Sequence, residues 1–262
     1  MPELPEVEVM TQNLRRWTEN QHITLHLLDS KILKSDGTDT VSGLAGVTYR
    51  RGKYTILPVG KMRVLFHYRM TGKLVLGAQR KHSRAFIMVN GVDSIWFVDV
   101  RRFGGIWFIP DTELNAFWTN KGIGPEIYPN NHDGEWWKNR FRGIKAPIKN
   151  ALLRQGCVAG LGNICASEIC YRAQVAPSQP TNQLTDAEWT AISAATSAYL
   201  SEIIAEESGR EIHYVTQGGT RPSAFWVYGC AGEPCRRCGQ LIRRFVQAGR
   251  ATFYCDHCTP MH

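Results

Sequence analysis

Four cysteines close to the C-terminal end of the chain constrain its fold more than any other feature. They form two C-x2-C pairs, Cys235 with Cys238 and Cys255 with Cys258, separated by sixteen residues. This is the spacing of a four-thiolate zinc site, and four thiolates leave no open position on a tetrahedral zinc ion. The sequence therefore predicts one structural zinc ion. We expect the remaining cysteines to be small buried hydrophobic residues: Cys157, Cys165, Cys170 and Cys230.

The segment between the two cysteine pairs is strongly basic. From Pro234 to Cys255 it contains five arginines and no acidic residue. A zinc-stabilised hairpin that carries arginines is suited to contacting phosphates. The alternative is a zinc ribbon that only stabilises the end of the chain, with its charges simply solvated.

The composition is that of a globular protein with a substantial core. Of 262 residues, 43% are hydrophobic and 21% charged, which excludes a disordered or collagen-like chain. No run approaches the roughly 18 apolar residues that a membrane span requires. The first residues lack the pattern of an export signal, so we expect a cytoplasmic protein. The net charge of +8 admits a polyanionic partner without proving one.

Hydrophobic periodicity divides the chain into two parts. Residues 1 to 20 have apolar residues at helical spacing, with Pro5 in the first turn. From about residue 23 to 110 the period changes to two, and Gly60-Lys61 and Asn90-Gly91 supply hairpin turns, which indicates a β-sandwich or barrel. We expect strands at 55–57, 63–66, 73–76, 86–89, 95–98 and 106–109.

The second part is predicted to be helical. A Gly-, Pro- and Asn-rich stretch at 122–131 is typical of a linker. Thr185 and Glu188 have the spacing of a capping box before one long helix. The apolar face of that helix comprises Trp189, Ile192, Thr196, Tyr199 and Ile203, and three shorter helices are expected before it at 136–141, 145–154 and 164–171.

The N-terminal Met1-Pro2-Glu3 contains a candidate nucleophile. We expect Met1 to be removed because proline is small, which would expose the secondary amine of Pro2. An α-amine titrates near pH ~8, so a useful fraction is neutral at pH 7 and can attack an electrophilic sugar carbon. Glu3 beside it could transfer protons. The alternative interpretation is a frayed terminus that leads into a helix.

Two further segments have residue types that are suited to nucleic-acid binding. Gly160-Leu161-Gly162-Asn163 precedes a predicted helix, whose first N–H groups could bind a phosphate; the alternative is a turn that only connects two helices. The segment from Asp99 to Gly105 has two arginines and an aromatic residue beside glycines, which suits a protruding loop. Its Phe103, together with Met70, could enter a base stack. The alternative for both is core packing.

These elements together resemble the formamidopyrimidine-DNA glycosylase and endonuclease VIII family. The resemblance covers nearly the whole chain in the order of the family, and Leu4 and the Arg101-Arg102-Phe103 triplet favour the formamidopyrimidine branch. The matching stretches are 1–8, 51–54, 70–72, 99–104, 160–166 and 235–258.

The resemblance implies an α+β fold with three domains. An N-terminal helix and β-sandwich would form a catalytic domain at 1–125, a helical helix-two-turn-helix domain would occupy 126–228, and a zinc finger 229–262. It implies a bifunctional glycosylase and AP lyase of base-excision repair, which removes oxidised purines through a Schiff base on Pro2 followed by β,δ-elimination. Its partner would be damaged double-stranded DNA at the nucleoid, bound by a monomer with no obligate protein partner and no membrane.

The resemblance also implies roles for single residues. Pro2 would be the nucleophile, Glu3 the general acid/base, and Lys53 and Arg250 would contact phosphate and assist elimination. Met70, Arg101 and Phe103 would fill the gap left by the flipped nucleotide. Further DNA contacts would come from His82, Lys145, Lys149, Asn163 and Tyr228, and the zinc ligands would be Cys235, Cys238, Cys255 and Cys258.

Three departures from the family pattern affect base recognition. The segment 213–225 is shorter than the usual loop over a flipped purine, Arg69 replaces a small residue, and Cys165 replaces a tyrosine. The same chemistry on other lesions, including oxidised pyrimidines, is therefore one alternative. A damaged-DNA-binding protein without catalysis is a second, and a generic zinc-ribbon module that binds nucleic acid is a third.

Overall fold

The computed structural model describes residues 2–35, 39–213 and 219–260. The chain forms two compact units. The first comprises Met1–Lys121 and Glu207–Thr220, and the second comprises Gly122–Glu206 and Arg221–His262.

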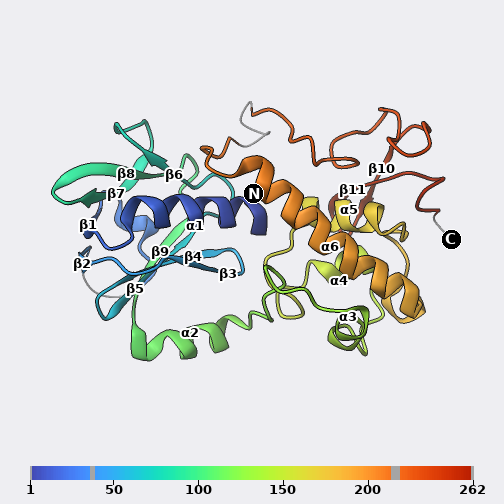
Figure 1. The fold of residues 1–262 in the computed structure, drawn as a ribbon, viewed down its shortest axis with the longest axis horizontal. Helices are drawn as coiled ribbons and strands as arrows, with labels where there is room; N and C mark the ends of the chain where they lie inside the picture. The colour runs from blue at the N-terminus through green and yellow to red at the C-terminus, as the bar shows by residue number, and fades with distance from the viewer. Residues whose placement is uncertain (1, 36–38, 214–218, 261–262) are drawn as a thin grey trace. The chain divides into compact units, whose positions relative to one another are not determined.

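The first unit begins with the helix α1 (Leu4–Thr18), as the sequence predicts. Val7, Met10 and Leu14, which recur at helical spacing, are fully or almost fully buried. The helix runs beside the two sheets of the unit (Figure 1) and contacts β3, β4 and β6. Burial of this apolar face, rather than helix propensity alone, stabilises the position of α1.

Two antiparallel sheets follow α1 and confirm the predicted sandwich. One has the strand order β2-β1-β7-β8-β6 and the other β3-β4-β5-β9. The strands are β1 (His22–Leu27), β2 (Thr40–Leu44), β3 (Tyr49–Arg51), β4 (Tyr54–Val59), β5 (Met62–His67), β6 (Lys73–Leu76), β7 (Ser83–Val89), β8 (Val92–Val98) and β9 (Gly105–Pro110).

The inner faces of the sheets meet in an apolar core. The rings of Phe66 on β5 and Phe97 on β8 have centroids 6.1 Å apart, and both side chains are buried. The turns at Gly60-Lys61 and Asn90-Gly91 connect strands as predicted, and Asn90 and Gly91 both have positive φ. Such turns match the twist of the strands they connect.

The second unit is helical and ends in a hairpin. Its helices are α3 (Gly134–Arg140), α4 (Ile148–Leu152), α5 (Asn163–Arg172) and α6 (Asp186–Glu207). The hairpin consists of β10 (Arg243–Gln247) and β11 (Arg250–Tyr254). The capping box of α6 is confirmed, because the N–H of Thr185 donates to Glu188 (2.7 Å) and the N–H of Glu188 to Thr185 Oγ1 (3.2 Å). All five predicted residues of its apolar face are buried.

Some elements differ from the sequence prediction. The helix expected over 145–154 is wrong in extent, because Pro147 is the N-cap of α4 and the helix has only five residues. A short helix, α2 (Leu114–Lys121), was not predicted, although Leu114, Phe117 and Trp118 lie at helical spacing on it and are half-buried. Strands β1, β2 and β3 lie within the region of period two but were not singled out.

After α6 the chain returns to the first unit. Glu211 accepts from Lys73 Nζ at 2.7 Å and from both terminal nitrogens of Arg80 at 2.8 Å. These ion pairs hold residues 211–213 against β6 and the loop that follows it. The central part of the divergent segment 213–225, residues 214–218, lies outside the described residues.

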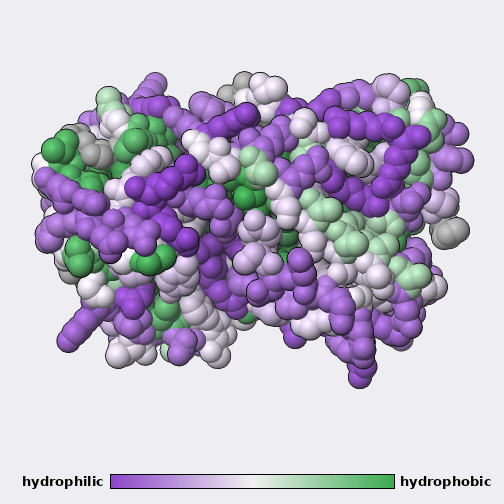
Figure 2. All heavy atoms as spheres, in the orientation of Figure 1, coloured by the Kyte–Doolittle hydropathy of each residue, from purple (hydrophilic) through white to green (hydrophobic). Residues whose placement is uncertain are grey.

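Hydrophilic residues cover most of the face in Figure 2, and hydrophobic ones form separate patches there. No helix in the described part of the chain is long and apolar enough to cross a membrane.

Candidate active site

Pro2 and Glu3 lie at a capped, buried helix start. Pro2 is buried, and Glu3 is 3% exposed. Glu3 is the N-cap of α1, where its side chain accepts from the N–H of Glu6 and its own N–H donates to Glu6 Oε2 at 2.8 Å. This reciprocal pair satisfies N–H groups that would otherwise be unpaired. The two residues are therefore held in place rather than frayed.

The capping box brings two carboxyl groups together. Burial, assisted by the charge of Glu3, raises the pKa of Glu6 from its ordinary 4.5 to about 7. A proton is therefore retained beside Glu3 at a pH where most carboxyl groups are ionised.

This pKa predicts how stability depends on pH. The folded chain binds the Glu6 proton more tightly than the unfolded chain, so the contribution of Glu6 is fully present below pH 4.5 and is lost as pH rises through about 7. In Glu6→Gln this dependence should disappear, and the variant should be more stable than the parent at about pH 8 but not at about pH 4.5. Denaturation midpoints at both pH values measure this, and the same pH slope in both proteins would contradict it.

Lys53 lies in a tight hairpin turn that is attached to α1. Gly52 and Lys53 form the two-residue turn between β3 and β4, with Gly52 at φ +56°. Lys53 is 9% exposed. Arg50 donates to Glu8 of α1 at 2.8 Å and to the carbonyl of Gly52 at 3.0 Å. The ion pair thus connects the turn to the second turn of the helix that begins beside Pro2.

A chain of buried hydroxyl groups couples α1 to the sheet. Thr11 Oγ1 donates to the carbonyl of Val7 (2.7 Å) and shares a hydrogen bond with Thr55 Oγ1 (2.7 Å), to which Tyr68 Oη also donates (2.8 Å). Thr55 follows the Lys53 turn, and Tyr68 directly precedes the Met70 loop. Buried networks of this kind favour a single arrangement when every member is paired.

The three proposed gap-filling residues lie at the surface. Met70 is 39% exposed and Phe103 50% exposed. Arg101 is exposed, and its guanidinium lies 4.4 Å from the centroid of the Phe103 ring. Core packing, the alternative for Met70 and Phe103, is therefore excluded.

Asp99 joins the two loops that carry these residues. Its carboxylate is fully buried and accepts from Thr71 Oγ1, from the N–H of Arg101 (3.3 Å) and from the N–H of Gly104 (2.8 Å). A Cβ on Gly104 would lie 2.8 Å from the ring of Phe97, so only glycine fits there. Nothing in the sequence around Asp99 predicts this role.

Three further residues that were predicted to contact DNA, His82, Lys145 and Lys149, differ in exposure. His82 is half-buried at φ +70° beside Arg84, and Lys145 is exposed. Lys149, in contrast, is fully buried. Its Nζ donates to Asn163 Oδ1 (2.6 Å), Thr252 Oγ1 (2.8 Å) and the carbonyl of Ala251 (3.1 Å).

This buried ammonium fixes the start of α5 to the hairpin. Asn163, the first residue of α5, also donates from Nδ2 to the carbonyl of Ala251 at 2.9 Å. Gly162 is the N-cap of α5, and Gly160 has φ +96°, so the glycine-rich turn does open a helix. The first N–H groups of α5 and the residue next to Ala251, Arg250, therefore belong to one rigid assembly.

Arg250 follows the turn of the hairpin and is exposed. Of the five finger arginines, three have protein partners: Arg236 and Arg237 donate to carbonyl groups, and Arg243 pairs with Asp256 at 2.6 Å. Among the described residues, the guanidinium groups of Arg244 and Arg250 form no hydrogen bond or ion pair with the protein. These two guanidinium groups are available to a ligand.

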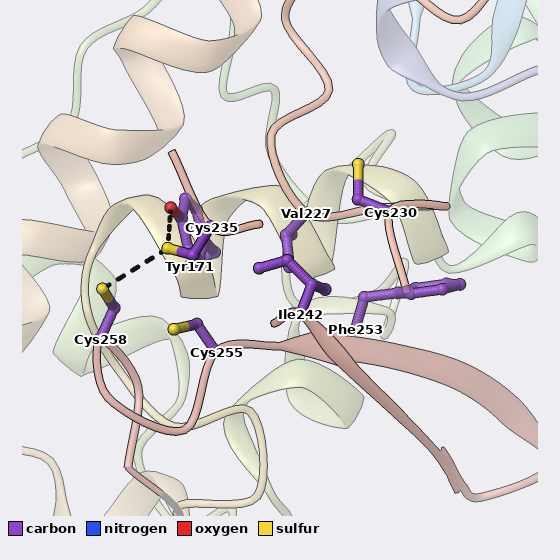
Figure 3. Close-up of a cluster of buried hydrophobic side chains, with 8 residues drawn as sticks. All are labelled: Tyr171, Val227, Cys230, Cys235, Ile242, Phe253, Cys255 and Cys258. Atoms are coloured by element: carbon purple, nitrogen blue, oxygen red, sulfur yellow. Dashed lines mark hydrogen bonds between the residues drawn. The ribbon is translucent and has the colours of Figure 1, made fainter. Parts of the chain in front are cut away.

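The four cysteines of the zinc motif converge. Their sulfur atoms all lie within 4.8 Å of one another, and the sulfurs of Cys235 and Cys258 are 3.8 Å apart. A tetrahedral ion with Zn–S bonds of about 2.3 Å requires sulfurs about 3.8 Å apart. Figure 3 shows that Cys230, although in the same buried cluster, directs its sulfur away from the site. The quartet fits one structural zinc ion, as predicted.

The close packing of the four thiols affects their ionisation. Burial and the neighbouring thiols raise the pKa of Cys258 well above its ordinary value. A bound divalent ion removes this penalty because it stabilises thiolates. Cys165, Cys170 and Cys230 are buried and Cys157 is half-buried, as expected for small hydrophobic residues.

Tyr228 is partly buried against Phe253, with ring centroids 4.9 Å apart. Its position depends on Glu168, a residue that was not predicted from the sequence. This fully buried carboxylate of α5 accepts from the N–H groups of Trp226, Val227 and Tyr228 at 2.8–3.1 Å. The only signal in the sequence was an acidic residue among the apolar residues Ile164, Cys165, Ile169 and Cys170.

Comparisons with known proteins point to the same family along nearly the whole chain. Models of three domains match: the formamidopyrimidine-DNA glycosylase N-terminal domain over residues 1–106, its H2TH domain over 123–213, and a zinc finger found in this glycosylase and in IleRS over 232–260. The formamidopyrimidine-DNA glycosylase of Streptococcus pneumoniae is 33% identical, over 98% of each chain.

Solved structures agree in fold. A MutM structure in complex with DNA containing carbocyclic 8-oxo-G has a TM-score of 0.86 and 29% identity, over 99% of this chain and 100% of that one. The Lactococcus lactis protein in complex with DNA containing an oxidised pyrimidine has a TM-score of 0.88 and 28% identity over the same shares. Domain order, the zinc motif and full-length similarity agree, and the chain belongs to the formamidopyrimidine-DNA glycosylase family.

Proposed function

We propose that this chain is a DNA glycosylase and AP lyase that excises oxidised purines from duplex DNA in base-excision repair. The observation that carries the proposal is the arrangement at the start of α1, where Pro2 and the capped Glu3 are tied through Glu8 and Arg50 to the turn of Lys53. Binding alone requires no such arrangement of an N-terminal imino acid, a carboxylate and a lysine.

The chemistry follows from these residues. After removal of Met1, the lone pair of the Pro2 nitrogen attacks C1′ of the damaged nucleotide, the bond to the base breaks, and the base leaves with a proton. Glu3 supplies or accepts protons, and ring opening gives an iminium between Pro2 and the sugar. Loss of the C2′ proton then expels the 3′ phosphate, and a second elimination expels the 5′ phosphate.

DNA binding requires the damaged nucleotide to leave the base stack. This costs a few kcal/mol, which phosphate contacts and inserted side chains offset. We assign the insertion to Met70, Arg101 and Phe103, whose exposure suits it. Phosphate contacts are assigned to Lys53 and Arg250.

The remaining DNA-contact assignments rest on the same resemblance: His82, Lys145, Lys149, Asn163 and Tyr228. Lys149 is buried, so we assign it an indirect role: it holds the start of α5 in position, and the start of α5 contacts the DNA. The domain division at 125 and 228, a monomeric state and action at the nucleoid belong to the same proposal.

The proposal also concerns which damaged bases the enzyme excises. The MutM neighbour is in complex with an 8-oxo-G lesion, and the Lactococcus lactis neighbour with an oxidised pyrimidine. The altered segment 213–225 and Arg69 support a range that differs from that of the typical oxidised-purine enzyme. Base release from duplexes that carry either lesion measures this directly.

Arg250→Ala tests the phosphate contact and strand cleavage. We expect about tenfold weaker binding to abasic duplex DNA, a salt dependence reduced by about one phosphate contact, and loss of the δ-elimination product. Arg244→Ala is the matched control, because Arg244 is exposed on the same hairpin and also lacks a partner among the described residues. Equal effects of the two variants on affinity and products would refute the role of Arg250.

A further inference from the structure

Arg69 adopts a backbone conformation that disfavours it. Its φ is +52°, in the left-handed region, which glycine adopts without cost and which is sterically unfavourable for a residue with a side chain. The loop enforces this conformation. The N–H of Arg69 donates to His67 Nδ1 at 3.2 Å, and the N–H of Gly72 donates to the carbonyl of Tyr68 at 2.9 Å. A glycine at position 69 would satisfy the same geometry at lower conformational cost.

The hydrogen bond from the Arg69 N–H requires a neutral imidazole. His67 is buried, and burial together with the charges of Arg69, Lys53 and Lys121 lowers its pKa to about 3. The ring is therefore neutral at physiological pH and can accept. Tyr54, which follows Lys53, pairs with His67 across β4 and β5, so the Lys53 turn and the Arg69 loop lie at the same end of these strands.

The side chain of Arg69 is exposed to solvent. Within the described ranges its guanidinium forms no hydrogen bond or ion pair with the protein, so no contact of the arginine side chain offsets the cost of its backbone conformation. Arg69 directly precedes Met70, which is exposed at the tip of the same loop. Strained backbone conformations cluster at sites where a side chain contacts a ligand.

We propose that Arg69 binds DNA, contacting the phosphate backbone of the damaged strand between the Lys53 contact and the inserted Met70. This rests on the proposed function. A guanidinium binds a phosphate through two parallel hydrogen bonds, and it adds to the positive field of Lys53 at the point where Met70 enters the stack.

Arg69→Gly separates the effect of Arg69 on the stability of the fold from its effect on DNA binding. The variant should be at least as stable as the parent, because the strain is relieved, yet bind abasic duplex DNA about tenfold more weakly with a salt slope reduced by about one. Arg69→Lys, which retains the charge, should keep most of the slope.

Two controls match the two effects. Asn20→Gly relieves a positive φ (60°) at an exposed position of the same unit and should leave affinity unchanged. Lys61→Ala removes an exposed charge from the β4–β5 turn and should change the slope far less than Arg69→Gly. Equal slopes for Arg69→Gly and Lys61→Ala would overturn the proposal for Arg69. Failure of the parent protein itself to form a borohydride-reducible adduct with abasic DNA would instead overturn the proposed function.

Discussion

Glu3→Gln should lower base release from an 8-oxoguanine duplex by about 10²–10⁴-fold, the usual contribution of a general acid/base. Glutamine has the same shape and retains an oxygen that can accept the N–H of Glu6, so the capping box of α1 should persist. Binding of the duplex should therefore remain close to that of the parent. Single-turnover base release and affinity, measured on the same preparation, separate the two quantities.

Glu19→Gln is the matched control for this prediction. Glu19 is the C-cap residue of α1, at the opposite end of the helix, and the substitution makes the same change of charge. Its base release should equal that of the parent. A Glu3→Gln variant that releases base within tenfold of the parent would remove Glu3 from the reaction.

Cys255→Ser should abolish the bound zinc and, with it, high-affinity DNA binding. Cys255 is fully buried in a cluster that also contains Tyr171, Ile242 and Phe253 (Figure 3). The binding energy of a structural zinc, about 10–16 kcal/mol in isolated fingers, stabilises the fold around it. Without the ion the hairpin should lose its order, and Arg250 its position, so we expect at least about 100-fold weaker binding to abasic DNA, as for loss of several phosphate contacts.

Cys157→Ser provides the comparison, because Cys157 is a half-buried cysteine outside the quartet. It should retain one zinc ion per chain and the affinity of the parent. Metal content by atomic absorption and affinity by titration report both properties. Full affinity in zinc-free Cys255→Ser would show that the finger does not carry a DNA contact.

Regular periodicity made much of the fold predictable. The apolar faces of α1 and α6, the strands bounded by hairpin turns and the capping box at Thr185 all depend on neighbours in the sequence. Helix α2 was not predicted although Leu114, Phe117 and Trp118 have helical spacing, because eight residues give only two turns of that pattern. The helix expected over 145–154 begins only after Pro147, because a proline suits the start of a helix but not its interior.

The site was less predictable, because its members depend on partners distant in the sequence. Met70 and Phe103 have the character of core residues, and only the buried Asp99, which joins their loops, explains why they are exposed. Lys149 and Glu168 are charged residues on helices, which ordinarily face solvent. Their burial depends on acceptors and donors in residues 226–228 and 251–252.

The most direct test of the account is to locate the covalent bond to DNA. The protein is incubated with abasic duplex DNA and borohydride, and the adduct is digested and sequenced by mass spectrometry. We predict that the sugar is attached to the nitrogen of Pro2, on a peptide that lacks Met1, and that a chain with a blocked N-terminus forms no adduct. Attachment to a lysine such as Lys53, or undiminished trapping by the blocked chain, would contradict the assignment of Pro2 as the nucleophile.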